Sequence, residues 1–145
     1  MAFLKGKRAV IVGLASNRSI AWGIAQALRN EGAELAFSYQ NSKLQGRVEK
    51  MAGELGSDIA APMDVAEDHE INRFFKDLRK TWEEFDILVH SVAFAPSDQL
   101  EGRYLDSINR EGFRVAHEIS SYSLSALTKT ARPMMSNRNG AILTM

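Results

Sequence analysis

Residues 8–28 restrict the possible folds of this chain more than any other segment, because they join an apolar run, a glycine and a helical pattern. The apolar run ends at Gly13, and a short polar loop leads from there to Ser19. Beyond the loop, Ile20, Ile24 and Leu28 recur at helical spacing. A buried strand that turns on a glycine into a helix N-terminus is typical of sites that bind a dinucleotide pyrophosphate. The G-x-G-x-x-G pattern of such sites is absent, since Ser19 stands where a glycine-rich loop would normally continue.

Strand-like apolar runs and helical patterns alternate along the rest of the chain. We expect strands at residues 8–13, 34–39, 58–63, 86–91 and 140–145, and helices at residues 19–31, 44–55, 67–85 and 112–132. Pro133 is expected to stop the last helix. Strands that are apolar on both faces and separated by helices predict an α/β fold, a doubly wound parallel sheet of the Rossmann type.

Two features concern the boundaries of the domain. Residues 92–107 form the one long connection, and it follows a strand at the sheet edge where open α/β folds place their ligands, so we expect it to wall a substrate site. The last strand, at residues 140–145, would leave an apolar edge uncovered. We therefore expect residues 1–145 to form a dinucleotide-binding domain that is incomplete at its C-terminal end.

Composition excludes several classes of partner. The 18 basic and 18 acidic residues give a formal net charge of zero, which argues against nucleic acid or an anionic membrane as the main partner. Cysteine is absent, which excludes disulfides and thiolate chemistry and fits a reducing compartment. No signal-peptide pattern or membrane-length apolar run is present, so we expect a cytoplasmic protein.

Candidate nucleotide-binding residues follow the second and third strands. Gln40 lies where a dinucleotide fold places the residue that contacts the adenosine ribose, and a neutral side chain there favours NADH over NADPH. Alternatively, Gln40 is simply the first residue of a surface loop. Asp64, followed by Val65, could accept a hydrogen bond from the adenine amino group or cap the next helix.

The fourth strand contains His90 and leads into Ser91, Val92 and Ala93. Small residues after a strand let the chain pass close to a cofactor, although the pattern alone favours tight packing as their role. We interpret His90 as a core histidine rather than an acid or base.

The remaining polar side chains carry weaker signals. His69 and His117 lack a partner at metal-ligand spacing, so no metal site is expected. Residues 120–123 form a polar cluster in the long helix, in which Tyr122 could donate a proton but more simply serves packing or an interface.

Five segments in register resemble the bacterial NADH-dependent enoyl-(acyl-carrier-protein) reductases, a divergent branch of the short-chain dehydrogenase/reductase family. They are SIAWGIA (19–25), ELAFSYQN (34–41), MDVAED (63–68), HSVAFAPSDQL (90–100) and REGFRVAHEISSYS (110–123). The resemblance covers essentially the whole chain. One departure is Val92-Ala93, where the family often has Ile-Gly. By this resemblance, the added methyl group of Ala93 would narrow the pocket beside the nicotinamide.

The resemblance also implies roles for particular residues. The pyrophosphate would lie on Gly13, Ser19 and Ile20, and the adenosine ribose near Gln40. The implied adenine contacts are Asp64 and Val65, the residues along the path to the nicotinamide are Ser91 and Val92, and the contact to the acyl substrate is Ala95.

The implied reaction reduces the trans-2 double bond of an acyl group carried on acyl carrier protein, in fatty acid biosynthesis. The family uses a Tyr-x6-Lys pair and a further Tyr after the fifth strand. No residue of this chain matches those positions, so no catalytic residue is assigned. The resemblance further implies a homotetramer, for which the helix at 112–132 is a plausible interface.

Two alternatives remain open at this point. Another short-chain dehydrogenase could act on a ketone or alcohol, although the SIAWGIA segment argues against it. A non-catalytic dinucleotide-binding module would share the same glycine turn.

Overall fold

A five-stranded parallel sheet forms the centre of the computed structural model, which describes residues 2–145. The strands are β1 (Arg8–Val12), β2 (Glu34–Tyr39), β3 (Ala60–Pro62), β4 (Ile87–His90) and β5 (Ala141–Thr144). They lie in the order β3-β2-β1-β4-β5, and every neighbouring pair is parallel. The predicted doubly wound sheet is therefore confirmed, with its reversal of strand order beside β1.

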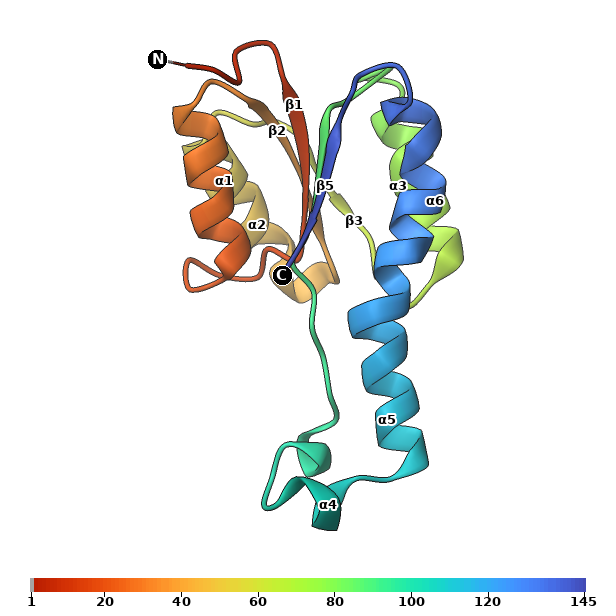
Figure 1. Ribbon diagram of the computed structural model, residues 1–145. Coiled ribbons are helices and arrows are strands. Elements are labelled where there is room, and N and C mark those ends of the chain that lie inside the picture. Colours follow the sequence, from red (N-terminus) through yellow and green to blue (C-terminus); the bar gives the residue numbers. More distant parts are fainter. Residues whose placement is uncertain (1) are drawn as a thin grey trace.

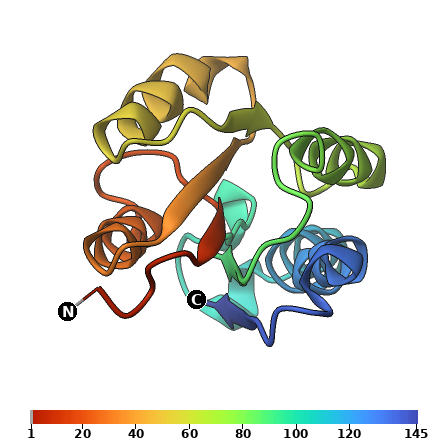
Figure 2. The same ribbon diagram turned by 90° about the horizontal axis from the view of Figure 1, so that it is seen from above.

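Helices cover both faces of this sheet (Figure 1). The longer ones are α1 (Ile20–Asn30), α2 (Ser42–Glu54), α3 (Asp68–Leu78), α5 (Arg110–His117) and α6 (Ser123–Met135). Figure 2 shows α1 and α2 on one side of the strands and α3 and α6 on the other. Successive residues of a strand point to opposite faces, so Val10 packs under α3 and α6 while Ile11 packs under α1 and α2.

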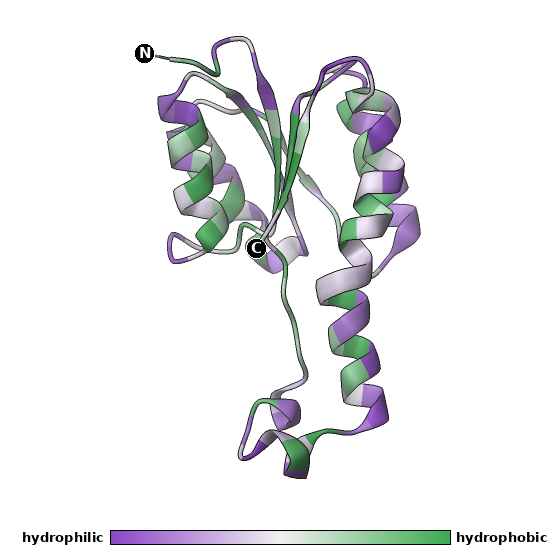
Figure 3. Ribbon diagram, viewed as in Figure 1, coloured by the Kyte–Doolittle hydropathy of each residue, from purple (hydrophilic) through white to green (hydrophobic). Residues whose placement is uncertain are grey.

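The two core clusters explain why the strands carry continuous apolar runs. In β1 and β4, the residues Ala9, Val10, Ile11, Leu88 and Val89 are completely buried. Figure 3 shows the same runs as hydrophobic colour along the central strands. Both faces of the sheet are therefore buried at its central strands, as is typical of parallel sheets, whereas every residue of the edge strand β5 is exposed.

Two predicted helix boundaries were wrong. α3 ends at Leu78 rather than Phe85, and Trp82 and Phe85 are buried in the turn that follows it. Pro133 does not stop the last helix, since α6 continues to Met135. The proline removes one backbone donor, but Met134 and Met135 gain buried positions on the core, and their burial favours the extra turn.

The long helical segment also begins earlier than expected and is not regular. α5 starts at Arg110, where the Asn109 side chain accepts from the Gly112 N–H at 2.8 Å. Between α5 and α6 the chain makes a π-helical turn, η2 (Glu118–Tyr122). In Figure 1, α5 and the short helix α4 (Tyr104–Ser107) extend beyond the carboxyl ends of the strands.

Candidate cofactor site

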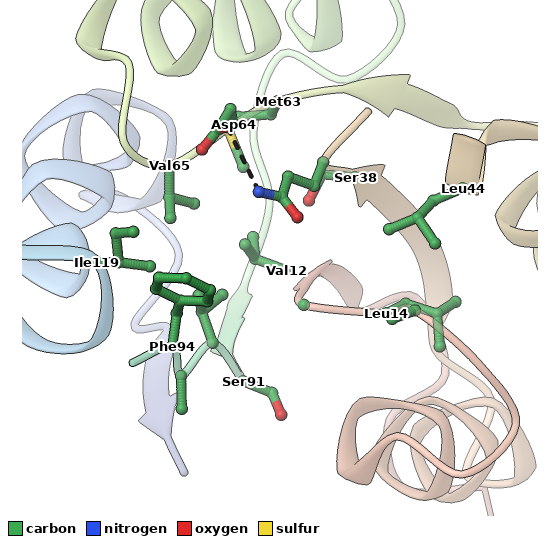
Figure 4. Close-up of a pocket in the computed structure, with 15 residues that line it drawn as sticks. Val12, Leu14, Ser38, Leu44, Met63, Asp64, Val65, Ser91, Phe94 and Ile119 are labelled. Carbon is green, nitrogen blue, oxygen red and sulfur yellow. Dashed lines mark hydrogen bonds between the residues drawn. The ribbon is translucent and has the colours of Figure 1, made fainter. Parts of the chain in front are cut away.

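A cavity of about 190 Å³ opens at the carboxyl edge of the sheet. It lies beside β1, where the strand order reverses, which is the position at which open α/β sheets bind their ligands. Its lining residues come from the carboxyl ends of β1 and β2, from the segments that follow β1, β2, β3 and β4, and from α2 and η2 (Figure 4). They are Val12, Gly13, Leu14, Ala15, Ser38, Gln40, Leu44, Met63, Asp64, Val65, Ser91, Val92, Ala93, Phe94 and Ile119.

Gly13 makes the turn out of β1 possible. Its φ angle is +106°, a conformation that residues with a side chain rarely adopt. A Cβ atom at this position would overlap the carbonyl oxygen of Ser91. The loops after β1 and β4 can therefore meet closely, and the Ser91 N–H donates to the Val12 carbonyl at 2.9 Å.

Ser19 organises the loop that follows this turn. Its Oγ accepts hydrogen bonds from the backbone N–H groups of Ala15 (3.1 Å) and Ser16 (3.0 Å), and makes no side-chain cap on α1. Among residues 2–145, the N–H groups of Ile20 and Ala21, in the first turn of α1, have no hydrogen-bond acceptor. Free N–H groups and the positive end of the helix dipole suit an anionic group such as a pyrophosphate.

Gln40 and Asp64 meet at the β2–β3 side of the cavity. The Gln40 Nε2 donates to the Asp64 Oδ2 at 3.4 Å, drawn as the dashed line at Asp64 in Figure 4. The other Asp64 oxygen accepts from the Ala66 N–H at 2.9 Å and closes a turn. The N-cap of α3 is Glu67, so the alternative in which Asp64 caps that helix was wrong.

The β4 side of the cavity is apolar. Val92 and Ile119 pack at the edge of the core cluster, and Phe94, half exposed, forms the wall beside them. His90, directly before this wall, is completely buried, as its interpretation as a core histidine requires. Burial lowers the pKa of His90, since it disfavours the charged form of the ring.

The nine candidate site residues divide into two groups. Those that line the cavity are Gly13, Gln40, Asp64, Val65, Ser91 and Val92. Those outside its lining are Ser19, which acts on the loop, Ile20, which is 60% exposed, and Ala95, beyond Phe94.

Sequence reasoning missed several lining residues. Ile119 comes from a helical segment 27 residues beyond Val92, and no local pattern links the two. Ser38 was detectable, since it is a polar residue within the apolar part of β2, and in the structure it is only 2% exposed. Tyr122, considered as a proton donor, is 52% exposed and does not line this cavity.

Two further findings concern metals and membranes. Within residues 2–145, no three His, Cys, Asp or Glu side chains gather as a metal site. Over the same residues, none of the helices combines the length and the apolar character needed to cross a bilayer.

Comparison with known sequences places this geometry in context. A family model described as enoyl-(acyl carrier protein) reductase matches residues 13–145. The enoyl-(acyl-carrier-protein) reductase (NADH) of Escherichia coli is 56% identical over 145 residues, and that of Neisseria meningitidis is 57% identical over the same length. Both alignments cover 100% of this chain but only 55% and 56% of the relatives, so the chain spans about half of their length.

Solved structures give the same result. The crystal structure of the enoyl-(acyl-carrier-protein) reductase (NADH) from Aquifex aeolicus superposes with a TM-score of 0.95 at 48% identity, over 98% of this chain and 56% of that one. A reductase from Anaplasma phagocytophilum in complex with NAD has a TM-score of 0.93 at 38% identity, over 99% of this chain and 54% of that one. The chain therefore belongs to the enoyl-(acyl-carrier-protein) reductase family.

Proposed function

We propose that this chain forms the NADH-binding part of a reductase that reduces the trans-2 double bond of enoyl groups on acyl carrier protein, in fatty acid biosynthesis. The observation that carries the proposal is the cavity at the strand-order reversal, bounded by the Gly13 turn on one side and the Gln40–Asp64 pair on another. The names of the relatives, which specify NADH and enoyl-acyl carrier protein, support it.

The cavity and the start of α1 together would hold a dinucleotide. The free N–H groups of Ile20 and Ala21 would receive the pyrophosphate, next to the turn at Gly13. The polar pair Gln40 and Asp64 would hold the adenosine end.

At the other end of the cavity, the backbone after β4 would lead toward the nicotinamide. Ser91 and Val92 line this path, and Val65, which also lines the cavity, would contact the adenine together with Asp64. Ala95, the residue after Phe94 in the sequence, would contact the acyl chain.

NADH, when bound, would supply the hydride that adds to the β-carbon of the enoyl thioester. The negative charge that then develops on the thioester oxygen needs a hydrogen-bond donor placed beside it, and the α-carbon needs a proton. We assign neither task to a residue of this chain. The apolar wall of Val92, Phe94 and Ile119 would exclude water from the reacting atoms.

The first prediction concerns the choice between the two nicotinamide cofactors. A 2′-phosphate near Gln40 would meet the Asp64 carboxylate, a like charge, and no cation from the cavity lining. We therefore expect NADH to bind at least about tenfold more tightly than NADPH, an interaction difference of about 1.4 kcal/mol.

Fluorescence titration of the full-length protein with each nucleotide measures this difference. An Asp64→Asn variant removes the repelling charge and should narrow the gap by weakening NADH and strengthening NADPH. Equal binding of both nucleotides by the wild-type protein would contradict the proposed selectivity, and no binding of either would contradict the proposed function.

The second prediction concerns turnover. The full-length protein should oxidise NADH when a crotonyl thioester is added, whereas a verified polypeptide of residues 1–145 should not. The reason is that stabilising the negative charge on the thioester oxygen requires a hydrogen-bond donor, and we place none of residues 1–145 beside that oxygen. Turnover by the 145-residue polypeptide would show that the catalytic groups lie within it.

We also propose a cytoplasmic homotetramer. An exposed face on α5 and η2, which includes Phe113 (53% exposed) and Tyr122 (52% exposed), supports the subunit contact. Sedimentation of the full-length protein measures its oligomeric state.

A further inference from the structure

The π-helical turn η2 holds the loop after β4 through one side chain. The Ser120 Oγ accepts a hydrogen bond from the Phe94 N–H at 2.9 Å and donates one to the Phe94 carbonyl at 3.1 Å. A single hydroxyl group thus satisfies both backbone groups of one residue. π-helical turns of this kind are frequent at functional sites.

The loop has little else to hold it. From Val92 to Ala95, Phe94 is the only residue whose backbone hydrogen-bonds to another part of residues 2–145, and both of its bonds go to Ser120. The Phe94 side chain is 50% exposed, so packing fixes it only in part. Phe94 nevertheless forms a wall of the cofactor cavity.

The turn itself is anchored to the sheet on its other side. The Ser123 Oγ donates its only proton to the Ile119 carbonyl at 2.6 Å, so it accepts from the His90 Nε2 at 2.8 Å. In the neutral ring only one nitrogen carries a proton, so the His90 Nδ1 then accepts from the Thr144 hydroxyl at 2.9 Å. This chain of bonds fixes η2 to β4 and β5, and gives Ser120 a rigid base.

We infer that Ser120 is a positioning residue, which acts through Phe94 to hold the apolar wall of the cavity in its binding conformation. The inference rests on the proposed binding of NADH in this cavity. Without the hydroxyl group, the loop would lose its order in the free protein, and NADH binding would have to supply the free energy of ordering it.

The test compares three variants of the full-length protein. Ser120→Ala removes the hydroxyl group, and Ser120→Thr retains one. Ser121→Ala is the matched control, since Ser121 is exposed and its hydroxyl group makes no hydrogen bond within the described part of the chain. The measurements are amide hydrogen exchange at Phe94, the melting temperature, the Kd for NADH, and the kcat and KM of turnover.

We expect Ser120→Ala to exchange the Phe94 amide at least tenfold faster and to raise the Kd and KM for NADH about five- to tenfold, the effect of one or two hydrogen bonds. Turnover at saturating NADH should stay within twofold of wild type. Ser120→Thr should restore most of the affinity, and Ser121→Ala should match wild type.

Three results would overturn the inference. They are unchanged Phe94 exchange in Ser120→Ala, faster exchange without weaker NADH binding, and an equal loss of affinity in Ser121→Ala. If the wild-type protein itself fails to bind NADH, the proposed function fails instead, and the exchange data still report whether Ser120 orders the loop.

Discussion

Replacement of Gly13 by alanine is expected to abolish measurable NADH binding and to destabilise the fold. The backbone at this position has a φ angle of +106°, and a residue with a side chain held there costs about 1–3 kcal/mol. The added methyl group would also overlap the Ser91 carbonyl oxygen, which belongs to the backbone and cannot rotate away. Relief of the overlap would separate the loops after β1 and β4, which together line the cofactor cavity.

Gly23→Ala in α1 is the matched control, because it adds the same methyl group to the same strand–turn–helix unit. A Cβ atom at Gly23 would meet no atom within 4 Å, and alanine stabilises a helix relative to glycine by about 1 kcal/mol. We therefore expect unchanged NADH binding and an equal or higher melting temperature. Titration with NADH and thermal unfolding separate the two variants, and a Gly13→Ala protein that binds NADH normally would refute the role of this turn.

The turn at Gly13 was predictable because its evidence is local. An apolar run, a glycine and a helical pattern stand next to one another in the sequence, and each selects a backbone conformation within a few residues. The parallel sheet was predictable for a related reason, since alternating strands and helices with apolar strand centres have few other ways to bury their surface.

Helix ends and side-chain partners depend on contacts between residues that are distant in the sequence. The local sequence pattern does not reveal such contacts. Trp82 and Phe85 continue the apolar spacing of α3, yet they are buried from a turn beyond its end. Periodicity reports which residues are buried, not the backbone conformation that buries them.

The same contrast between local evidence and long-range contacts holds for the residues of the candidate site. Gly13 and Gln40 directly follow β1 and β2, and Asp64 lies two residues beyond the end of β3, so the predicted strand ends indicated all three. The contact between Phe94 and Ser120 joins residues 26 positions apart and exists only because η2 lies beside the loop after β4. No spacing rule predicts such a pair.

Asp86 should show the second large effect, at the edge of the sheet opposite the cavity. Its carboxylate is almost fully buried and accepts hydrogen bonds from Lys7 Nζ (3.0 Å), the Arg8 N–H (2.9 Å) and Arg138 Nε (3.1 Å) and Nη2 (3.0 Å). It thereby connects the segments that enter β1, β4 and β5. Since hydrogen bonds to a buried charge are strong, Asp86→Asn should lower the free energy of unfolding by about 2–3 kcal/mol, measured in urea.

The same carboxylate should make stability depend on pH in the acid range. Burial opposes its ionisation, but the hydrogen bonds from Arg138, the Arg8 N–H and Lys7 outweigh burial and lower the pKa of Asp86. A lowered pKa means that this stabilisation is complete above the unfolded value, about 3.9, and is lost as the pH falls from there through the folded value. The difference between wild type and Asp86→Asn should therefore be full at neutral pH and shrink below about pH 4.

The control for Asp86 is Glu34→Gln, which removes an exposed ion pair with Arg8 at the same end of the sheet. An exposed pair contributes less than about 1 kcal/mol, because water solvates both charges when the pair is broken. An Asp86→Asn protein as stable as Glu34→Gln at neutral pH would mean that the polar atoms of asparagine replace the carboxylate in full. The side chain at position 86 would then hold the segments that lead into β1, β4 and β5 through the geometry of its hydrogen bonds rather than through its charge. Any dependence of stability on acid pH would have to arise from other residues.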